Sequence, residues 1–171
     1  KEAVKLYDDA TNMLQDIITN QWLKAKAVIG IWPANTVNYD SIEVYDPNDP
    51  KKVIHQFECL RQQLKKAAGQ PNLSLADFIA PKESARKDYI GGFAVTAGIG
   101  IEKHIERFEN NHDDYSIIMI KALADRLAEA FAELMHAKVR KDFWGYARRE
   151  KLSNEELIQE KYQGISPAAG Y

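Results

Sequence analysis

The chain has 171 residues, 45% hydrophobic and 28% charged, which is typical of a globular domain that buries its own core. Its 23 basic and 25 acidic residues are interspersed and give a net charge of -2, which excludes the basic field that nucleic acids and anionic membranes require. A single cysteine excludes an internal disulfide and favours a reducing compartment, so we expect the protein in the cytoplasm. No apolar run has the roughly 20 residues of a membrane helix.

The first third of the chain predicts one helix followed by strands. Apolar residues recur every three or four positions from about Glu2 to Asn20, which indicates an amphipathic helix. Segments of strand length, rich in Val, Ile, Tyr and Phe, then run from Lys26 to Ile31, Ser41 to Tyr45 and Lys52 to Leu60. Turn-forming residues 33–35 and 46–50 separate them, so they predict an antiparallel meander.

The remaining two thirds predict one more strand and then helices. Residues 89–96 are apolar on both faces, which favours a central strand. Residues 101–111 and 115–141 predict a short helix and a long helix, the latter spanning about 40 Å. Ser153 and Glu156 have the spacing of a capping box, for a last helix that ends at Gly164. This order predicts an α+β fold, a mostly antiparallel twisted sheet with a long central helix and flanking helices, as a single domain over 1–171.

An acidic stripe lies on the predicted long helix. Asp125, Glu129 and Glu133 are four residues apart and therefore share one helix face. Neighbouring like charges at this spacing cost about 0.2 to 0.5 kcal/mol per pair, which Lys121 and Arg126 can offset. A solvated helix face and a carboxylate surface for a cation such as a sulfonium are the two interpretations.

The tail from Gly164 to Tyr171 is rich in Pro, Ala and Gly. Its backbone groups cannot all pair within a helix or a ladder, so they are available to the edge of a small planar ligand such as adenine. A disordered linker is the alternative.

Other chemical motifs are weak. The four histidines have no metal-ligand spacing and are expected at surface or capping positions: His55, His104, His112 and His136. Gly98-Ile99-Gly100 lacks the rest of a dinucleotide fingerprint. Cys59 is expected to be a buried, inert thiol within a strand.

Several long segments, in one order along the chain, resemble the C-terminal reactivation domain of cobalamin-dependent methionine synthase. They are Ile31-Trp-Pro-Ala-Asn35, Ser41-Ile-Glu-Val-Tyr45, Leu60-Arg-Gln-Gln63, Ala76-Asp-Phe-Ile-Ala-Pro81, Asp88-Tyr-Ile-Gly-Gly-Phe-Ala-Val-Thr96, Lys121-Ala-Leu-Ala-Asp-Arg-Leu-Ala-Glu-Ala-Phe-Ala-Glu133, Trp144-Gly-Tyr146, Asn154-Glu-Glu-Leu-Ile158 and Lys161-Tyr-Gln-Gly-Ile165. The resemblance implies most of such a domain, cut at both ends.

The resemblance also implies a function. Members of this family bind S-adenosylmethionine and present its methyl group to cob(II)alamin while flavodoxin or an equivalent reductase supplies one electron. The parent enzyme transfers methyl from methyltetrahydrofolate to homocysteine, with cobalamin held by another domain of the same polypeptide and zinc only in the homocysteine domain. The isolated domain is expected to be inactive alone.

The resemblance carries site residues over by position. The family's Arg-Pro-Ala-Pro-Gly-Tyr run matches Ser166, Pro167, Ala168, Ala169, Gly170 and Tyr171, of which Ala168, Gly170 and Tyr171 are the expected contacts of the cosubstrate. Asp125 and Glu129 match acidic positions that face the cobalamin domain. Ser166 replaces an arginine that can bind a carboxylate with two hydrogen bonds. A noncatalytic docking module for a flavodoxin-like or cobalamin-domain partner, without cosubstrate binding, is therefore the alternative, and an independent methyltransferase is a third interpretation.

Overall fold

The structure is a computed structural model, and it describes residues 1–167. The chain divides into two compact units that alternate along the sequence. The first unit comprises Lys1–Val28 and Phe93–Lys151, and the second comprises Ile29–Gly92 and Leu152–Tyr171. The expectation of a single domain over 1–171 stays a prediction.

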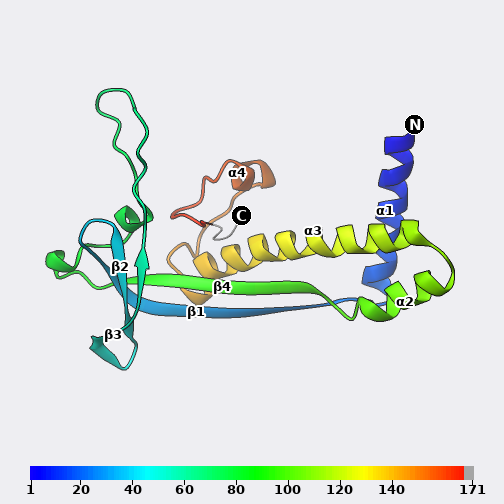
Figure 1. Ribbon diagram of the computed structural model, residues 1–171, viewed down its shortest axis with the longest axis horizontal. Helices are drawn as coiled ribbons and strands as arrows, with labels where there is room; N and C mark the ends of the chain where they lie inside the picture. The colour runs from blue at the N-terminus through cyan, green and yellow to red at the C-terminus, as the bar shows by residue number, and fades with distance from the viewer. Residues whose placement is uncertain (168–171) are drawn as a thin grey trace. The chain divides into compact units, whose positions relative to one another are not determined.

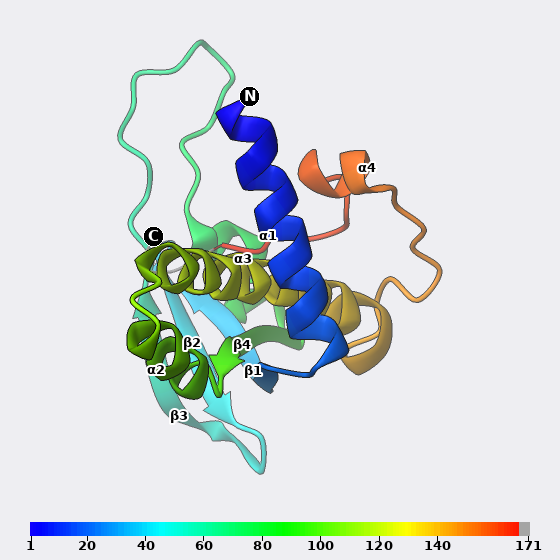
Figure 2. The same cartoon turned by 90° about the vertical axis from the view of Figure 1, so that its right-hand side faces the viewer.

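The first unit is mainly helical. Its helices are α1 (Glu2–Thr19), α2 (Glu102–Asn110) and α3 (Asp114–Lys138), and α3 continues into a π-helical turn at Val139–Phe143. Figures 1 and 2 show α1 crossing α3. The side chain of Asp113 begins α3 by accepting a hydrogen bond from the Ser116 backbone N–H at 3.0 Å, as expected of an N-cap. The three helices predicted in this part of the chain are confirmed, and the long one ends as an α-helix at Lys138.

Four strands form one sheet in the order β3-β2-β1-β4 (Figure 1). They are β1 (Lys24–Val37), β2 (Ser41–Asp46), β3 (Asp49–Glu58) and β4 (Asp88–Ile99). The β1–β2 and β2–β3 pairs are antiparallel, with Ile42 opposite Thr36 on one side and Phe57 on the other. The predicted meander and the α+β class are therefore confirmed.

Two strand predictions were wrong. Residues 33–35, expected in a turn, lie inside β1. The register with β2 begins at Ala34, so the missing N–H of Pro33 does not interrupt it. β4, expected at the centre, is an edge strand, and its burial alternates from Phe93 to Ala97 as in a strand with one covered face.

Each unit buries its own apolar side chains. In the second unit Ala34 of β1, Ile42 of β2 and Ala76 form a core cluster. In the first unit α3 buries Met119, Ile120 and Ala124 among other side chains. These clusters fix the sheet and the long helix α3, on which Asp125 and Glu129 lie.

The first unit also buries an ion pair. The Arg140 side chain is 1% exposed and meets Glu150 through two hydrogen bonds of 2.9 and 2.7 Å. The bidentate geometry satisfies both carboxylate oxygens, which a charge pair removed from water requires.

Three further expectations were wrong. His104 and His136 are buried, not superficial, and His104 stacks on Trp22 with 4.5 Å between ring centroids. The last helix, α4 (Asn154–Ile158), ends six residues before Gly164, because its backbone turns at Gln159 and then adopts a positive φ at Glu160. Cys59 lies just after β3 and is only partly buried.

No helix in the described part of the chain is long and apolar enough to cross a membrane.

Candidate functional site

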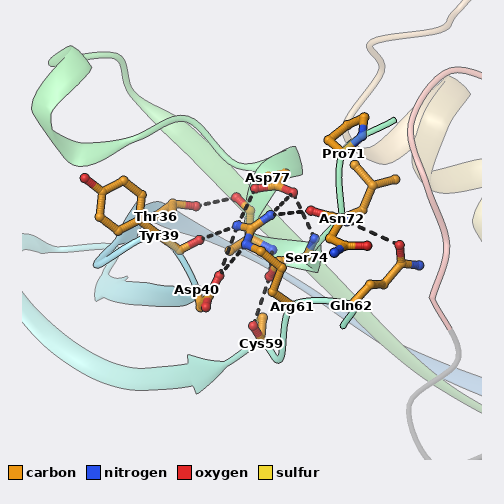
Figure 3. Close-up of polar contacts among 12 residues, drawn as sticks. Thr36, Tyr39, Asp40, Cys59, Arg61, Gln62, Pro71, Asn72, Ser74 and Asp77 are labelled. Carbon is orange, nitrogen blue, oxygen red and sulfur yellow. Dashed lines mark hydrogen bonds and ion pairs between the residues drawn. The ribbon is translucent and has the colours of Figure 1, made fainter. Parts of the chain in front are cut away.

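The segment between β3 and β4 is held by Arg61, which lies near its start (Figure 3). The guanidinium donates two hydrogen bonds to the Asp77 carboxylate, at 2.7 and 2.8 Å, and one to Asp40 at 3.0 Å. It also donates to the backbone carbonyl oxygens of Tyr39 and Asn72, at 2.9 Å each. One side chain therefore ties the β1–β2 turn to Asn72 and Asp77 in the middle of the segment.

The charges in this cluster stabilise one another. The hydrogen bond from Arg61, with a smaller contribution from the Ser74 backbone N–H, lowers the pKa of Asp77 to about 2. The hydrogen bond to Asp77 in turn raises the pKa of Arg61. The pair is thus charged throughout the physiological range, and the fork of the guanidinium fixes its geometry.

A capping box orders the second half of the segment. The Ser74 hydroxyl caps the 3₁₀ turn Leu75–Phe78, and the Asp77 carboxylate accepts from the Ser74 backbone N–H at 2.8 Å. The Ser74 hydroxyl also donates to the Cys59 carbonyl at 2.9 Å, and Thr36 of β1 donates to the Ala76 carbonyl at 2.6 Å. This turn therefore rests firmly on the sheet.

Gln62 joins the two arms of the segment, which are the stretch around Gln62 and the stretch around Leu73. Its backbone N–H donates to the Leu73 carbonyl at 2.9 Å, and its side-chain oxygen accepts from the Leu73 N–H at 3.3 Å. The same oxygen accepts from the Lys66 ammonium at 2.5 Å, and Lys66 also donates to the Pro71 carbonyl at 2.9 Å. The arms are therefore cross-linked at the base.

These arms form one wall of a pocket of about 570 Å³ within the second unit. The segment after α4 forms the other wall, and the Ser153–Glu156 capping box starts that helix as predicted. Apolar and polar residues both line the pocket: Leu60, Gln62, Leu73, Ser74, Leu75, Phe78, Glu160, Tyr162, Gly164, Ile165, Ser166 and Pro167. Its volume and mixed lining suit a small amphipathic molecule.

The structure places only some of the predicted site residues. Ser166 and Pro167 line the pocket, whereas Ala168, Gly170 and Tyr171 lie outside the described residues. The opposite wall was not assigned to the site from the sequence, although the Ser74 to Asp77 spacing is a recognisable capping signal.

The acidic stripe is exposed on α3, in the first unit. Asp125, Glu129 and Glu133 all reach solvent, and Arg126 forms an ion pair with Glu129 at 2.7 Å. Arg126 therefore offsets part of the repulsion along the stripe, as the spacing predicted. Within residues 1–167 no group of three or more His, Cys, Asp or Glu side chains is arranged to hold a metal.

Comparison with known proteins shows similarity to a protein family and to a solved structure. The family model of the vitamin B12 dependent methionine synthase activation domain matches residues 1–171. A crystal structure of the MetH reactivation domain bound to AdoHcy is similar with a TM-score of 0.89 and 53% sequence identity. The match covers 99% of this chain and 52% of that one, so this chain spans about half the length of the solved chain.

Proposed function

This chain belongs to the family of activation domains of vitamin B12 dependent methionine synthase, and we propose that it binds S-adenosylmethionine for reductive reactivation of the enzyme. In this proposal it presents the methyl group to cob(II)alamin during a one-electron reduction. The observation that carries the proposal is the similar reactivation domain bound to AdoHcy, which is S-adenosylmethionine without that methyl group.

The residues of the second unit suit this ligand. Ser166 and Pro167 begin the proposed binding run, which continues through Ala168, Gly170 and Tyr171 outside the described residues. Apolar side chains such as Phe78 can contact the nucleoside, while polar groups meet the charged amino-acid end. A sulfonium already has a good leaving group, so the work of the protein is to hold and orient the ligand.

The partners follow from the same proposal. Cobalamin, held by another domain of the parent enzyme, supplies the metal-centred methyl chemistry. We propose that Asp125 and Glu129 face that domain and that flavodoxin or an equivalent reductase supplies the electron, in the cytoplasm. The parent enzyme transfers methyl from methyltetrahydrofolate to homocysteine, and any zinc belongs to its homocysteine domain.

Calorimetric titration of the intact protein with S-adenosylmethionine tests the proposal. Saturable binding is expected, and Tyr171→Ala should weaken it roughly tenfold, the upper end of what one aromatic contact contributes. Tyr7→Ala is the matched control, because Tyr7 is 71% exposed on α1, and it should leave the affinity unchanged. A folded protein that gives no saturable heat would contradict the proposal and favour a docking module.

A further inference from the structure

The amide group of Gln62 has a defined orientation. Its oxygen accepts hydrogen bonds from the Lys66 ammonium at 2.5 Å and from the Leu73 backbone N–H at 3.3 Å. An ammonium and a backbone N–H can only donate, so the atom that meets them must be the amide oxygen. The NH₂ group is therefore on the opposite side of the side chain.

That NH₂ group is available at the pocket. Gln62 lines the pocket, and within residues 1–167 no hydrogen bond from its amide nitrogen is found. In Figure 3 the dashed line from the Gln62 side chain ends on the oxygen, and the nitrogen carries none. The NH₂ group of Gln62 is thus an oriented donor to which an acceptor of a ligand in the pocket can bind.

Lys66 makes this donor suitable for an anion. Its ammonium is held by two neutral carbonyl oxygens, those of the Gln62 side chain and of Pro71, and no carboxylate of the described residues forms an ion pair with it. A cation on the amide oxygen withdraws electron density and strengthens donation by the NH₂ group. The positive charge behind the amide also favours a negative acceptor in front of it.

The opposite wall carries the complementary charge. Glu160 lines the same pocket from the segment after α4, where the backbone holds it at a φ of 53°. Ser166 adds a hydroxyl donor to that wall. The Gln62 amide, with the Lys66 cation behind it, suits the carboxylate of an amino-acid group, and the Glu160 carboxylate on the opposite wall suits its ammonium.

We propose that Gln62, backed by Lys66, binds the α-carboxylate of S-adenosylmethionine, and that Glu160 faces its ammonium group. This inference rests on the proposed function and assigns the part of the ligand that the pocket receives. Ser166 is neutral, but the Lys66 cation behind Gln62 lies at the same site. Recognition of the carboxylate therefore does not depend on position 166 alone.

The test compares two ligands in the intact protein: S-adenosylmethionine and its decarboxylated form, which keeps the sulfonium and the adenosine. Gln62→Glu preserves the acceptor for Lys66 and Leu73 but replaces the NH₂ group with a carboxylate oxygen. The affinity for S-adenosylmethionine should fall about tenfold to a hundredfold, the range for a lost hydrogen bond to a charged group. Affinity for the decarboxylated ligand should be retained or increased.

Gln63→Glu is the matched control, since it introduces the same charge on the neighbouring residue, which does not line the pocket. It should leave the ratio of the two affinities unchanged, whereas Lys66→Met should shift that ratio in the same direction as Gln62→Glu. Equal weakening of both ligands by Gln62→Glu, or no effect on either, would overturn the inference alone. A wild-type protein that binds neither ligand would overturn the proposed function together with it.

Discussion

His136 is a buried titratable side chain near the end of α3. It is 6% exposed. Burial, together with a smaller effect of the positive charge of Arg140, lowers its pKa to about 4, and Glu150 opposes them. His136 is therefore neutral in the folded protein at neutral pH, where it can pack within the first unit without the cost of a buried charge.

This residue predicts acid sensitivity of the first unit. An unfolded histidine takes up a proton as the pH falls through about 6.5, whereas folded His136 stays neutral until about pH 4. Protons then favour the unfolded state, and the free energy of unfolding should be about 2 kcal/mol lower at pH 5 than at pH 7.5. Hydrogen exchange of the α3 amides in the intact protein measures this loss.

His136→Gln should remove that pH dependence, because glutamine does not titrate. His55→Gln, at an exposed position on β3, is the control and should leave the dependence intact. The same loss of protection in wild type and His136→Gln between pH 7.5 and 5 would show that other groups cause it.

Single residues were only partly predictable. The Ser153–Glu156 capping box was, because both of its partners lie within four positions in the sequence. The burial of His136 was not predicted. The contacts of Arg61 with Asp40 and Asp77 were not predicted either, because those partners are 16 or more residues away in the sequence. The same reason explains the site: the run at Ser166 carries a local motif, whereas the opposite pocket wall is defined only by tertiary contacts.

Among the elements, β1 contains a close contact between Trp32 and Gly30 that was not predicted from its sequence. Trp32 and Gly30 lie two positions apart and so share one face of the strand. A Cβ atom built on Gly30 would overlap the Trp32 ring, whereas one on Gly92 of β4 would lie 3.7 Å from it, an ordinary contact. The ring therefore occupies the space that the absent Gly30 side chain leaves.

Gly30→Ala should consequently destabilise the second unit by about 1 to 3 kcal/mol, the usual cost of forcing an extra methyl into filled space. Gly92→Ala adds the same methyl beneath the same ring and should cost much less. Urea-dependent proteolysis of the intact protein, followed at sites in the second unit, compares the two variants. A loss equal in both variants would mean that strand glycine itself, not the Trp32 contact, sets the stability.

Elements were predicted best where periodicity is local. The 3.6-residue pattern located α1, α2 and α3 to within a few residues of their ends. Strand order cannot be obtained in this way. Apolar residues on both faces of β4 suggested a central position, but the position of a strand is decided by the strands to which it is hydrogen-bonded, and β4 lies at the edge. Whether Pro33 can lie within a strand likewise depends on where pairing with β2 begins.

For the molecule as a whole, the two units are built from alternating parts of the chain, and boundaries fall within β1 and β4. No local pattern in the sequence marks those boundaries, since each strand continues through them. The pocket belongs to the second unit, and the exposed acidic stripe belongs to the first. In the proposed function, ligand binding and partner recognition therefore belong to different units, and charge reversal on α3 can test partner recognition separately.

Glu129→Lys makes that separation measurable in the intact enzyme. The change replaces the ion pair with Arg126, 2.7 Å in the wild type, by a like-charge pair on an exposed helix face. The cost should be only about 0.2 to 0.5 kcal/mol, so the melting temperature should change little.

Remethylation of cobalamin should nevertheless decrease, because a carboxylate proposed to face the cobalamin domain becomes a cation, while the affinity for S-adenosylmethionine should remain. Glu106→Lys on α2, an exposed position with the same charge change, should affect neither quantity. A large fall in melting temperature for Glu129→Lys would instead show that the stripe stabilises the fold, and unchanged remethylation would remove Glu129 from the docking surface.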